Sequence, residues 1–375
     1  MRKFVCYAVS TALAMLMGSV CFGQRYNQTN LVTNSSDSSL INPWGMSRGS
    51  GSPWWISDNV TGLATLYNGA GAKQGLVVTI PAAAPGKTGS PTGTIFNGST
   101  TDFLLAAGAP AVFLFSTIDG TIAAWNPSVG LAPGAKPPSK TAVTVVKTKD
   151  GSVFTGLTSA FVDGCRFLYV ANFSKGRVDV YDKSFHRVHL GEERFDDDQL
   201  PRDYVPFNVQ TIGNDIVVTY ALHLDGNPVE TDGPGFGYVD IYSSSGRLLR
   251  RLEHGDWLNA PWGVALAPLD FGQFSHDLLI GQFAGGGDTQ SSGYIAAYDL
   301  ATGRFKGLLQ DASGKPLSIS GIWDLSPGNA SPSNYDAAGS PAAELYFTAG
   351  SNHGSGGLLG YLTAVPTDLI QGNDQ

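Results

Sequence analysis

The chain has 375 residues, of which 42% are hydrophobic and only 14% are charged, and its formal net charge is −8. Its 48 glycines and 21 prolines are typical of many strands joined by turns. The negative charge, without any cluster of lysine and arginine, argues against nucleic acid as a partner, because phosphates would be repelled.

The first 23 residues have the pattern of an export signal. Arg2 and Lys3 give a positive start, residues 4–17 are apolar, and small residues would allow cleavage after Gly23. The apolar run is too short for a comfortable membrane span. We therefore expect the signal to be removed and the protein to be exported, to the periplasm or the outside of the cell. A lipoprotein signal acylated at Cys21 is the less favoured alternative.

We expect one β-propeller domain over residues 24–366, followed by a short polar tail at 367–375. Removal of the signal would leave Cys165 as the single cysteine, so no intrachain disulfide could form. The surrounding GCRFLYV predicts that Cys165 starts a strand, packs as a small apolar group and reacts slowly.

A short unit recurs six times along the chain, at intervals of about 48 to 63 residues. This interval fits the roughly 40–50-residue blades of propellers once loops are added. Each unit opens with a motif marked by Pro or Gly and continues into apolar strands. The six opening motifs are Asn42–Gly45 (NPWG), Pro91–Gly93 (PTG), Thr155–Leu157 (TGL), Pro206–Asn208 (PFN), Ala260–Gly263 (APWG) and Ser320–Trp323 (SGIW).

These units predict an all-β fold, a six-bladed β-propeller. The first five units hold four strands each, whereas the sixth holds only three. A spare strand at Asn30–Thr33 (NLVT) precedes the first motif. Pairing this strand with the last blade would close the ring and remove an exposed sheet edge.

The third strands of the first five units share one pattern. Each opens with Gly, which suits a tight turn, and closes with an aromatic residue followed by Asn, Asp or Ser. We expect these aromatic residues to pack between adjacent blades rather than to stack on carbohydrate. They are Tyr67, Trp125, Tyr181, Tyr242 and Tyr298.

Taken together, the motifs resemble a family of exported bacterial proteins of which some occur alongside the exosortase protein-sorting system. The motifs are NPWG, PWWISDN, TGLATLYN, DGTIAAWNP, LNAPWG and GIWDL followed by LYFTAG, and the match extends from about Leu31 to Leu362. The resemblance implies a propeller of the kind seen in NHL-repeat proteins and in the gluconolactonase superfamily. It brings no established activity, so it assigns no catalytic residue.

Two motifs suggest chemistry that their context does not support. Residues 45–49 (GMSRG) fit the nucleophile elbow of serine hydrolases, but that elbow needs a strand–turn–helix setting, and here the motif opens a predicted inner strand. Residues 196–198 (DDD) lack the alternating pattern and distal Glu of a calcium-binding EF-hand loop. We predict no catalytic residue from either motif.

The candidate ligand site is the mouth of the central channel, where equivalent strand ends meet. Asn and Asp oxygens there could hold a hard divalent cation such as Ca²⁺, as in lactonase propellers, or they could instead bond the backbone at the blade ends. The tryptophans either pack between blades or line the mouth, where together with amides they would suit a sugar or another neutral polar ligand. The candidate residues are Asn42, Trp44, Asp58, Asp119, Asn172, Asn208, Trp262, Gln282, Trp323 and Asp324.

Three functions remain open on this basis. The favoured one is a monomeric, non-catalytic exported propeller that binds a small polar ligand or an envelope protein through the channel mouth, without nucleic acid or a membrane span. The alternatives are a metal-dependent hydrolase of the lactonase type and a structural component of the extracellular matrix. The fold alone does not choose between them, because one fold hosts many functions.

Overall fold

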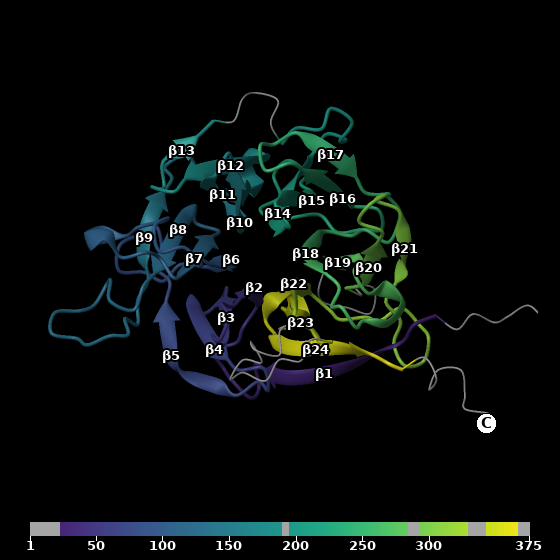
Figure 1. Ribbon diagram of the computed structural model, residues 1–375, viewed down its shortest axis with the longest axis horizontal. Coiled ribbons are helices and arrows are strands. Elements are labelled where there is room, and N and C mark those ends of the chain that lie inside the picture. The colour runs from purple at the N-terminus through teal and green to yellow at the C-terminus, as the bar shows by residue number, and fades with distance from the viewer. Residues whose placement is uncertain (1–22, 190–194, 284–292, 329–342, 367–375) are drawn as a thin grey trace, which may run out of the picture.

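The computed structural model describes residues 23–189, 195–283, 293–328 and 343–366, so the predicted export signal lies almost entirely outside the described residues. Six four-stranded antiparallel sheets stand around one axis (Figure 1). The prediction of a six-bladed β-propeller is confirmed.

Blades 1 to 3 follow one another along the chain, each with its first strand innermost. Blade 1 holds β2 (Pro43–Ser47), β3 (Trp54–Asp58), β4 (Leu63–Tyr67) and β5 (Lys73–Thr79); blade 2 holds β6 (Pro91–Phe96), β7 (Phe113–Thr117), β8 (Thr121–Trp125) and β9 (Val143–Lys147); blade 3 holds β10 (Phe154–Val162), β11 (Cys165–Asn172), β12 (Arg177–Asp182) and β13 (Arg187–Val188).

Blades 4 and 5 repeat this order, and blade 6 takes its outer strand from the N-terminal end of the described chain. Blade 4 holds β14 (Tyr204–Ile212), β15 (Asp215–Leu222), β16 (Gly237–Tyr242) and β17 (Leu248–Arg251); blade 5 holds β18 (Pro261–Leu266), β19 (Leu278–Gln282), β20 (Ile295–Tyr298) and β21 (Phe305–Leu308); blade 6 holds β22 (Ile322–Pro327), β23 (Leu345–Ala349), β24 (Leu358–Ala364) and β1 (Tyr26–Thr33).

The helical elements of the described chain are short turns between strands, and none is long and apolar enough to cross a membrane. They are η1 (Ala106–Gly108), η2 (Phe173–Lys175), η3 (Gly272–Phe274) and α1 (Ser351–Gly354).

The ring is closed by β1, which pairs antiparallel with β24 along its whole length (Figure 1). This confirms the predicted closure, and the strand starts four residues earlier than predicted, at Tyr26. Tyr26 is buried in the cluster between blades 5 and 6, and its hydroxyl donates to the Phe271 carbonyl over 2.9 Å. The closing strand is therefore anchored by packing as well as by its hydrogen-bond ladder.

Each pair of neighbouring blades encloses one apolar cluster, and these six clusters form most of the core. The aromatic residues that close the third strands lie in them, as predicted. Trp125, for example, packs on Trp55 of the preceding blade with 4.6 Å between ring centroids. All five are at most 6% exposed, so they stabilise the contact between blades and are not available to a ligand.

Cys165 starts β11 as predicted, but the prediction that it packs as an apolar group is wrong, because its side chain is exposed. Asp163 and Gly164 form the two-residue turn between β10 and β11, and both have positive φ. Cys165 therefore lies at the tip of a hairpin, beyond the apolar cluster that buries the middle of the same strand.

Deletion of residues 24–39 should lower the melting temperature sharply, because it removes the closing strand and exposes the edge of β24. Loss of the buried Tyr26 side chain alone corresponds to about 3–5 kcal/mol, or roughly 10 °C. Calorimetry would measure the change, with the exposed Asn27→Thr substitution in the same strand as a control. Unchanged melting of the deletion variant would contradict closure by β1.

Cys165 should react with a thiol reagent in the native protein at nearly the rate seen in denaturant, because no packing protects it. Stopped-flow labelling with a chromogenic disulfide would measure both rates. Slow native labelling that accelerates on unfolding would show that the hairpin tip is covered.

Candidate functional site

Each innermost strand is irregular at its start, where the register with the second strand shifts in all six blades. A β-bulge of this kind bends the strand and changes the direction in which a side chain points. We call the three residues at these positions the inner triplets. They are 43–45 (PWG), 91–93 (PTG), 154–156 (FTG), 206–208 (PFN), 261–263 (PWG) and 322–324 (IWD).

The third residue of each inner triplet sets the approach of the neighbouring blade. A Cβ atom on Gly45 would lie 2.8 Å from the Cα of Gly93, and one on Gly93 would lie 3.0 Å from the Cα of Gly156. Any larger side chain there would force the blades apart. Two triplets end in Asn208 or Asp324 instead of glycine.

Asn208 and Asp324 bond the backbone of the next blade. The Nδ2 of Asn208 donates to the Trp262 carbonyl over 2.8 Å. The carboxylate of Asp324 accepts from the backbone N–H of Met46 at 2.7 Å and of Leu325 at 2.8 Å. Both residues therefore hold adjacent inner strands together.

The remaining predicted polar residues, Asp58, Asp119, Asn172 and Gln282, lie at or just after the ends of second strands, as expected. Each of them is hydrogen-bonded within the fold, and none lines the mouth pocket described below. Their partners include, in the same order, Thr65, Ala83, Asp179 and Asn259.

The second residues of the inner triplets gather aromatic rings at the axis. Trp44 and Trp323 stack at 3.6 Å between ring centroids, and Trp262 meets them edge-on at 6.1 and 5.9 Å. Phe207, from the fourth triplet, contacts the same rings. The three tryptophans therefore pack against one another near the axis rather than between two neighbouring blades. They belong to a seventh cluster, separate from the six between the blades.

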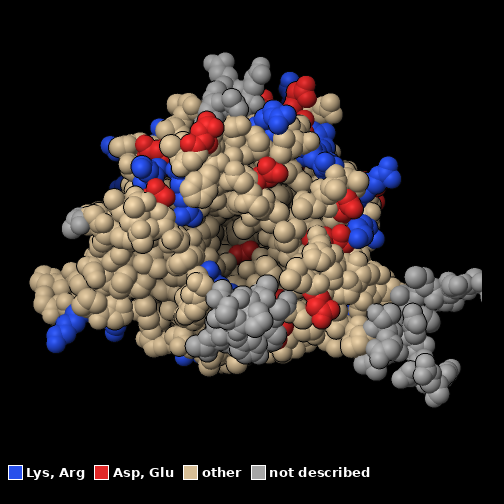
Figure 2. Space-filling model, viewed as in Figure 1, with Lys and Arg blue, Asp and Glu red and all other residues tan. Residues whose placement is uncertain are grey.

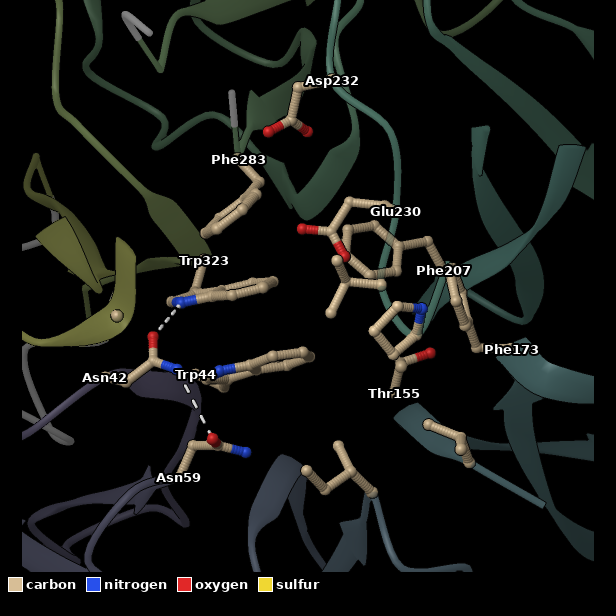
Figure 3. Close-up of a pocket in the computed structure, with 15 residues that line it drawn as sticks. Asn42, Trp44, Asn59, Thr155, Phe173, Phe207, Glu230, Asp232, Phe283 and Trp323 are labelled. Carbon is tan, nitrogen blue, oxygen red and sulfur yellow. Dashed lines mark hydrogen bonds between the residues drawn. The ribbon is translucent and has the colours of Figure 1, made fainter. Parts of the chain in front are cut away.

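Phe283, which follows β19, extends this stack. Its ring lies 4.1 Å from that of Trp323, on the side away from Trp44 (Figure 3). Trp323 is therefore enclosed between two rings, and its Nε1 donates to the Asn42 Oδ1 over 2.8 Å. The stack is rigid because its central member is fixed by both packing and a hydrogen bond.

A pocket, which we call the mouth pocket, opens beside this stack at the end of the channel where the inner strands begin. Figure 2, which views the ring from the same side as Figure 1, shows a hollow at the centre of the ring with an acidic side chain inside it. Of the predicted site residues, Asn42, Trp44 and Trp323 line the mouth pocket. The other lining residues include Asn59, Ile118, Val153, Thr155, Phe173, Phe207, Val229, Glu230, Asp232 and Phe283.

Two polar groups in this lining are buried without a hydrogen-bond partner among the described residues. They are the Nε1 of Trp44 and the Oγ1 of Thr155, on side chains of residues that are 8% and 3% exposed. Leaving a buried polar group unpaired costs about 1–3 kcal/mol. Both atoms are covered by neighbouring protein atoms, so neither is accessible from the mouth pocket.

Glu230 and Asp232 give the mouth pocket an acidic side. Both lie on the loop between β15 and β16, and Figure 3 shows Glu230 beside Phe207, across from the tryptophan stack. Burial raises the pKa of Glu230 to about 7, and the negative charge of Asp232 adds to the shift. Among the described residues, the lining includes no Lys, Arg or His.

The described residues do not fit a lactonase-type metal site. No group of three or more His, Cys, Asp or Glu side chains among them is placed to hold a metal ion. Asn208 and Asp324, two of the candidate residues, already form hydrogen bonds to the backbone of neighbouring strands. The Ser47 hydroxyl, from the GMSRG motif, accepts from the backbone N–H of Phe96 inside a β-strand, which is no setting for a nucleophile elbow.

Sequence reasoning did not single out several lining residues. Phe207 could have been found by aligning the inner triplets, since it stands where three other triplets carry tryptophan. Glu230 and Asp232 carried no comparable signal, because their loop belongs to no repeat.

The stability of the ring should depend on the protonation of Asp324. Burial raises its pKa to about 7, although the N–H groups of Met46 and Leu325 oppose the shift. Because this value lies above that of an unfolded Asp, the folded chain retains an extra proton between about pH 4 and 7. Its contribution to stability therefore falls as pH rises through that window.

Asp324→Asn should melt below the wild type, because an amide can accept only one of the two backbone N–H bonds. The deficit should be smaller at pH 8 than at pH 5.5, since only the wild type buries a charge at pH 8. Asp299→Asn is the control: the pKa of this exposed residue is lowered by Thr302, so its effect should be equal at both values. A deficit for Asp324→Asn that grows with pH would contradict this assignment.

Comparison with solved structures supports the fold. The structure of the PQQ-bound aldose sugar dehydrogenase from Streptomyces coelicolor is 13% identical, with a TM-score of 0.50, and the match covers 92% of this chain and 99% of that one. An outer coat vertex of COPII on membranes gives the same TM-score at 9% identity, over 87% of this chain and 69% of that one. Likeness at this level shows the fold alone.

No family model matches the chain. The uncharacterized protein R648 of Acanthamoeba polyphaga mimivirus is 30% identical over 343 residues, which cover 89% of this chain and 77% of R648. The similarity thus spans nearly the whole ring rather than one blade, and the chain belongs to the same family as the mimivirus protein R648.

Proposed function

We propose that this chain is an exported, non-catalytic propeller that binds a small polar ligand in its mouth pocket. The observation that carries the proposal is a pocket at the channel mouth whose aromatic wall stands beside the polar side chains of Asn59 and Glu230. An apolar wall with a few polar groups is the usual lining of a small-molecule site.

The mouth pocket is suited to binding because its walls are formed before any ligand arrives. Trp44 is held against Trp323, and Trp323 is held by Phe283 and Asn42. Side chains already fixed in one rotamer lose little entropy on binding, which favours affinity.

We favour binding over serine- or cysteine-type catalysis. Such catalysis needs the nucleophile within hydrogen-bond reach of a base. The described residues of the lining include no Ser, Cys, Lys or His, and the Thr155 hydroxyl has no hydrogen-bond partner among the described residues.

Export rests on the sequence. The charged and apolar pattern of residues 1–23 and the resemblance to exported bacterial proteins both support a location in the periplasm or outside the cell. We propose that the chain acts there as a monomer. N-terminal sequencing of the protein recovered from the medium or periplasm would test cleavage after Gly23.

Glu230→Ala should weaken binding of a mouth-pocket ligand by roughly three- to tenfold, because it removes a polar side chain from the lining. A thermal-shift screen of polar metabolites would find ligands, and calorimetry would measure their affinity. Asp225→Ala is the matched control, because Asp225 is an exposed acidic residue of the same loop that does not line the pocket. Ligands that bind both variants equally, or a screen without ligands, would contradict the proposal.

A further inference from the structure

We infer that the ligand of the mouth pocket is a small organic cation, an ammonium group on an apolar body, whose charge pairs with the Glu230 carboxylate. This inference rests on the proposed function and narrows it to one class of ligand. Three properties of the lining lead to it: an accessible carboxylate without a counter-ion, amides whose hydrogen bonds are made within the fold, and a wall of aromatic and aliphatic side chains.

Glu230 is an acidic side chain that the described fold leaves without a counter-ion. It is partly exposed, lines the mouth pocket, and forms neither an ion pair nor a side-chain hydrogen bond with any described residue. In Figure 3 its carboxylate points across the pocket, toward the side that carries Phe283 and Trp323. A ligand can therefore reach this group, unlike the covered polar atoms of Trp44 and Thr155.

The charge of the lining favours a cation and disfavours an anion. Burial and, to a smaller extent, the negative charge of Asp232 raise the pKa of Glu230 to about 7. The described lining includes no Lys, Arg or His, and residues 284–292 and 329–342, outside the described part of the chain, contain none in their sequence. A phosphate, sulfate or carboxylate would therefore be repelled in a partly desolvated site.

The amides of the lining have few hydrogen bonds free for a neutral polar ligand. The Oδ1 of Asn42 accepts from the Trp323 Nε1, and its Nδ2 donates to the Oδ1 of Asn59 over 3.4 Å. The Nδ2 of Asn59 donates to the Pro91 carbonyl over 3.1 Å. The accessible acidic group is then the main polar partner, and an ionised carboxylate only accepts hydrogen bonds, so the ligand must supply the donors.

The cost of covering Glu230 also separates a cation from a neutral ligand. Any ligand that fills the mouth pocket removes water from this carboxylate. A neutral ligand leaves its charge uncompensated, and burying such a charge is costly. An ammonium group offsets that cost, because it pairs with the charge and donates to it.

The rest of the wall favours an organic cation over a metal ion. Ca²⁺ takes roughly six to eight oxygen ligands, and no group of three or more His, Cys, Asp or Glu among the described residues is placed to hold a metal. Most of the lining is apolar and includes Phe173, Phe207 and Phe283. An organic cation suits both sides, because its ammonium group pairs with Glu230 while its apolar body contacts the rings.

The test is calorimetric titration at pH 8 of the full chain without its first 23 residues. The cationic probes are 2-phenylethylamine, isoamylamine and phenyltrimethylammonium. The matched neutral probes are 2-phenylethanol and isoamyl alcohol, with phenylacetate as the anion, glucose as a sugar and Ca²⁺ as the metal ion. At least one amine should bind, roughly tenfold tighter than its alcohol, because it adds a charge-assisted hydrogen bond. Phenylacetate, glucose and Ca²⁺ should not bind.

Glu230→Gln keeps the shape of the side chain but removes its charge. It should weaken amine binding about tenfold and change alcohol binding by less than roughly threefold. Asp225→Asn is the matched control, because Asp225 is an exposed acidic residue of the same loop outside the lining, and it should change neither. Equal losses for amine and alcohol in Glu230→Gln would overturn the inference, since they would show that the charge is not recognised.

The pH dependence of binding gives a second readout. The affinity for phenyltrimethylammonium, whose charge does not change with pH, should rise about tenfold from pH 6 to pH 8, as the ionised fraction of a group with a pKa of about 7 does. Glu230→Gln should abolish this rise. Asp232 is the other titratable residue of the described lining, and His223 contacts Phe173 from outside it, with 4.5 Å between ring centroids.

His223→Gln is the control for the pH experiment, because histidine also changes charge near neutral pH. It should keep the rise seen in the wild type, since the His223 Nε2 is bonded to the Asn227 carbonyl oxygen over 2.8 Å rather than to a lining residue. A rise that survives Glu230→Gln, or that His223→Gln abolishes, would overturn the role given to Glu230.

The outcomes separate this inference from the proposed function. If a neutral or anionic compound binds with an affinity that Glu230→Ala lowers, and no cation binds, the cation inference fails but the mouth pocket remains a binding site. If no probe binds and a broad metabolite screen gives no ligand sensitive to Glu230→Ala, both proposals fail.

Discussion

The candidate site depends on how closely six inner strands can approach one axis. Glycine in four of the inner triplets removes the side chain that would stand between neighbouring backbones, as at Gly45 and Gly93. In the other two triplets, the side chains of Asn208 and Asp324 form hydrogen bonds to the backbone of the next blade. Contact around the axis is thus made by backbone packing at some junctions and by side-chain hydrogen bonds at others.

This constraint determines what the channel mouth contains. In such a triplet the third residue contacts the neighbouring blade, and the side chain of the second residue lies near the axis. Three of these second residues are tryptophan and one is Phe207, so their large aromatic rings pack against one another near the axis. The aromatic wall of the mouth pocket therefore follows from the same bulges that bring the blades together.

The polar side of the mouth pocket has a different origin. Glu230 and Asp232 belong to the β15–β16 loop, which is specific to blade 4. Loops at the end of a regular scaffold can change without disturbing its core, and binding residues are often found there. In this protein the repeated ring supplies an aromatic surface, and one irregular loop places two acidic side chains beside it.

The sequence by itself determined the number of blades, the closing strand and the aromatic residues between blades. These features depend on local turn chemistry and strand periodicity, which residues close together in the sequence determine. An example is the third strand of each unit, which opens with Gly and closes with an aromatic residue. The exposure of Cys165 could not be predicted in this way, because a strand residue near a turn can lie either inside the core or beyond it.

Only the tertiary structure decided which of the candidate residues are hydrogen-bonded within the fold. Asn208 and Asp324 resemble ligands in sequence, yet their hydrogen bonds are used by strands 54 and 278 residues away along the chain. Trp44, Trp262 and Trp323 share one motif position, but only Trp44 keeps an unpaired N–H, because the other two indoles find acceptors in Thr155 and Asn42. Whether a polar group has a hydrogen-bond partner depends on the residues near it in space, and a single sequence does not show which residues those are.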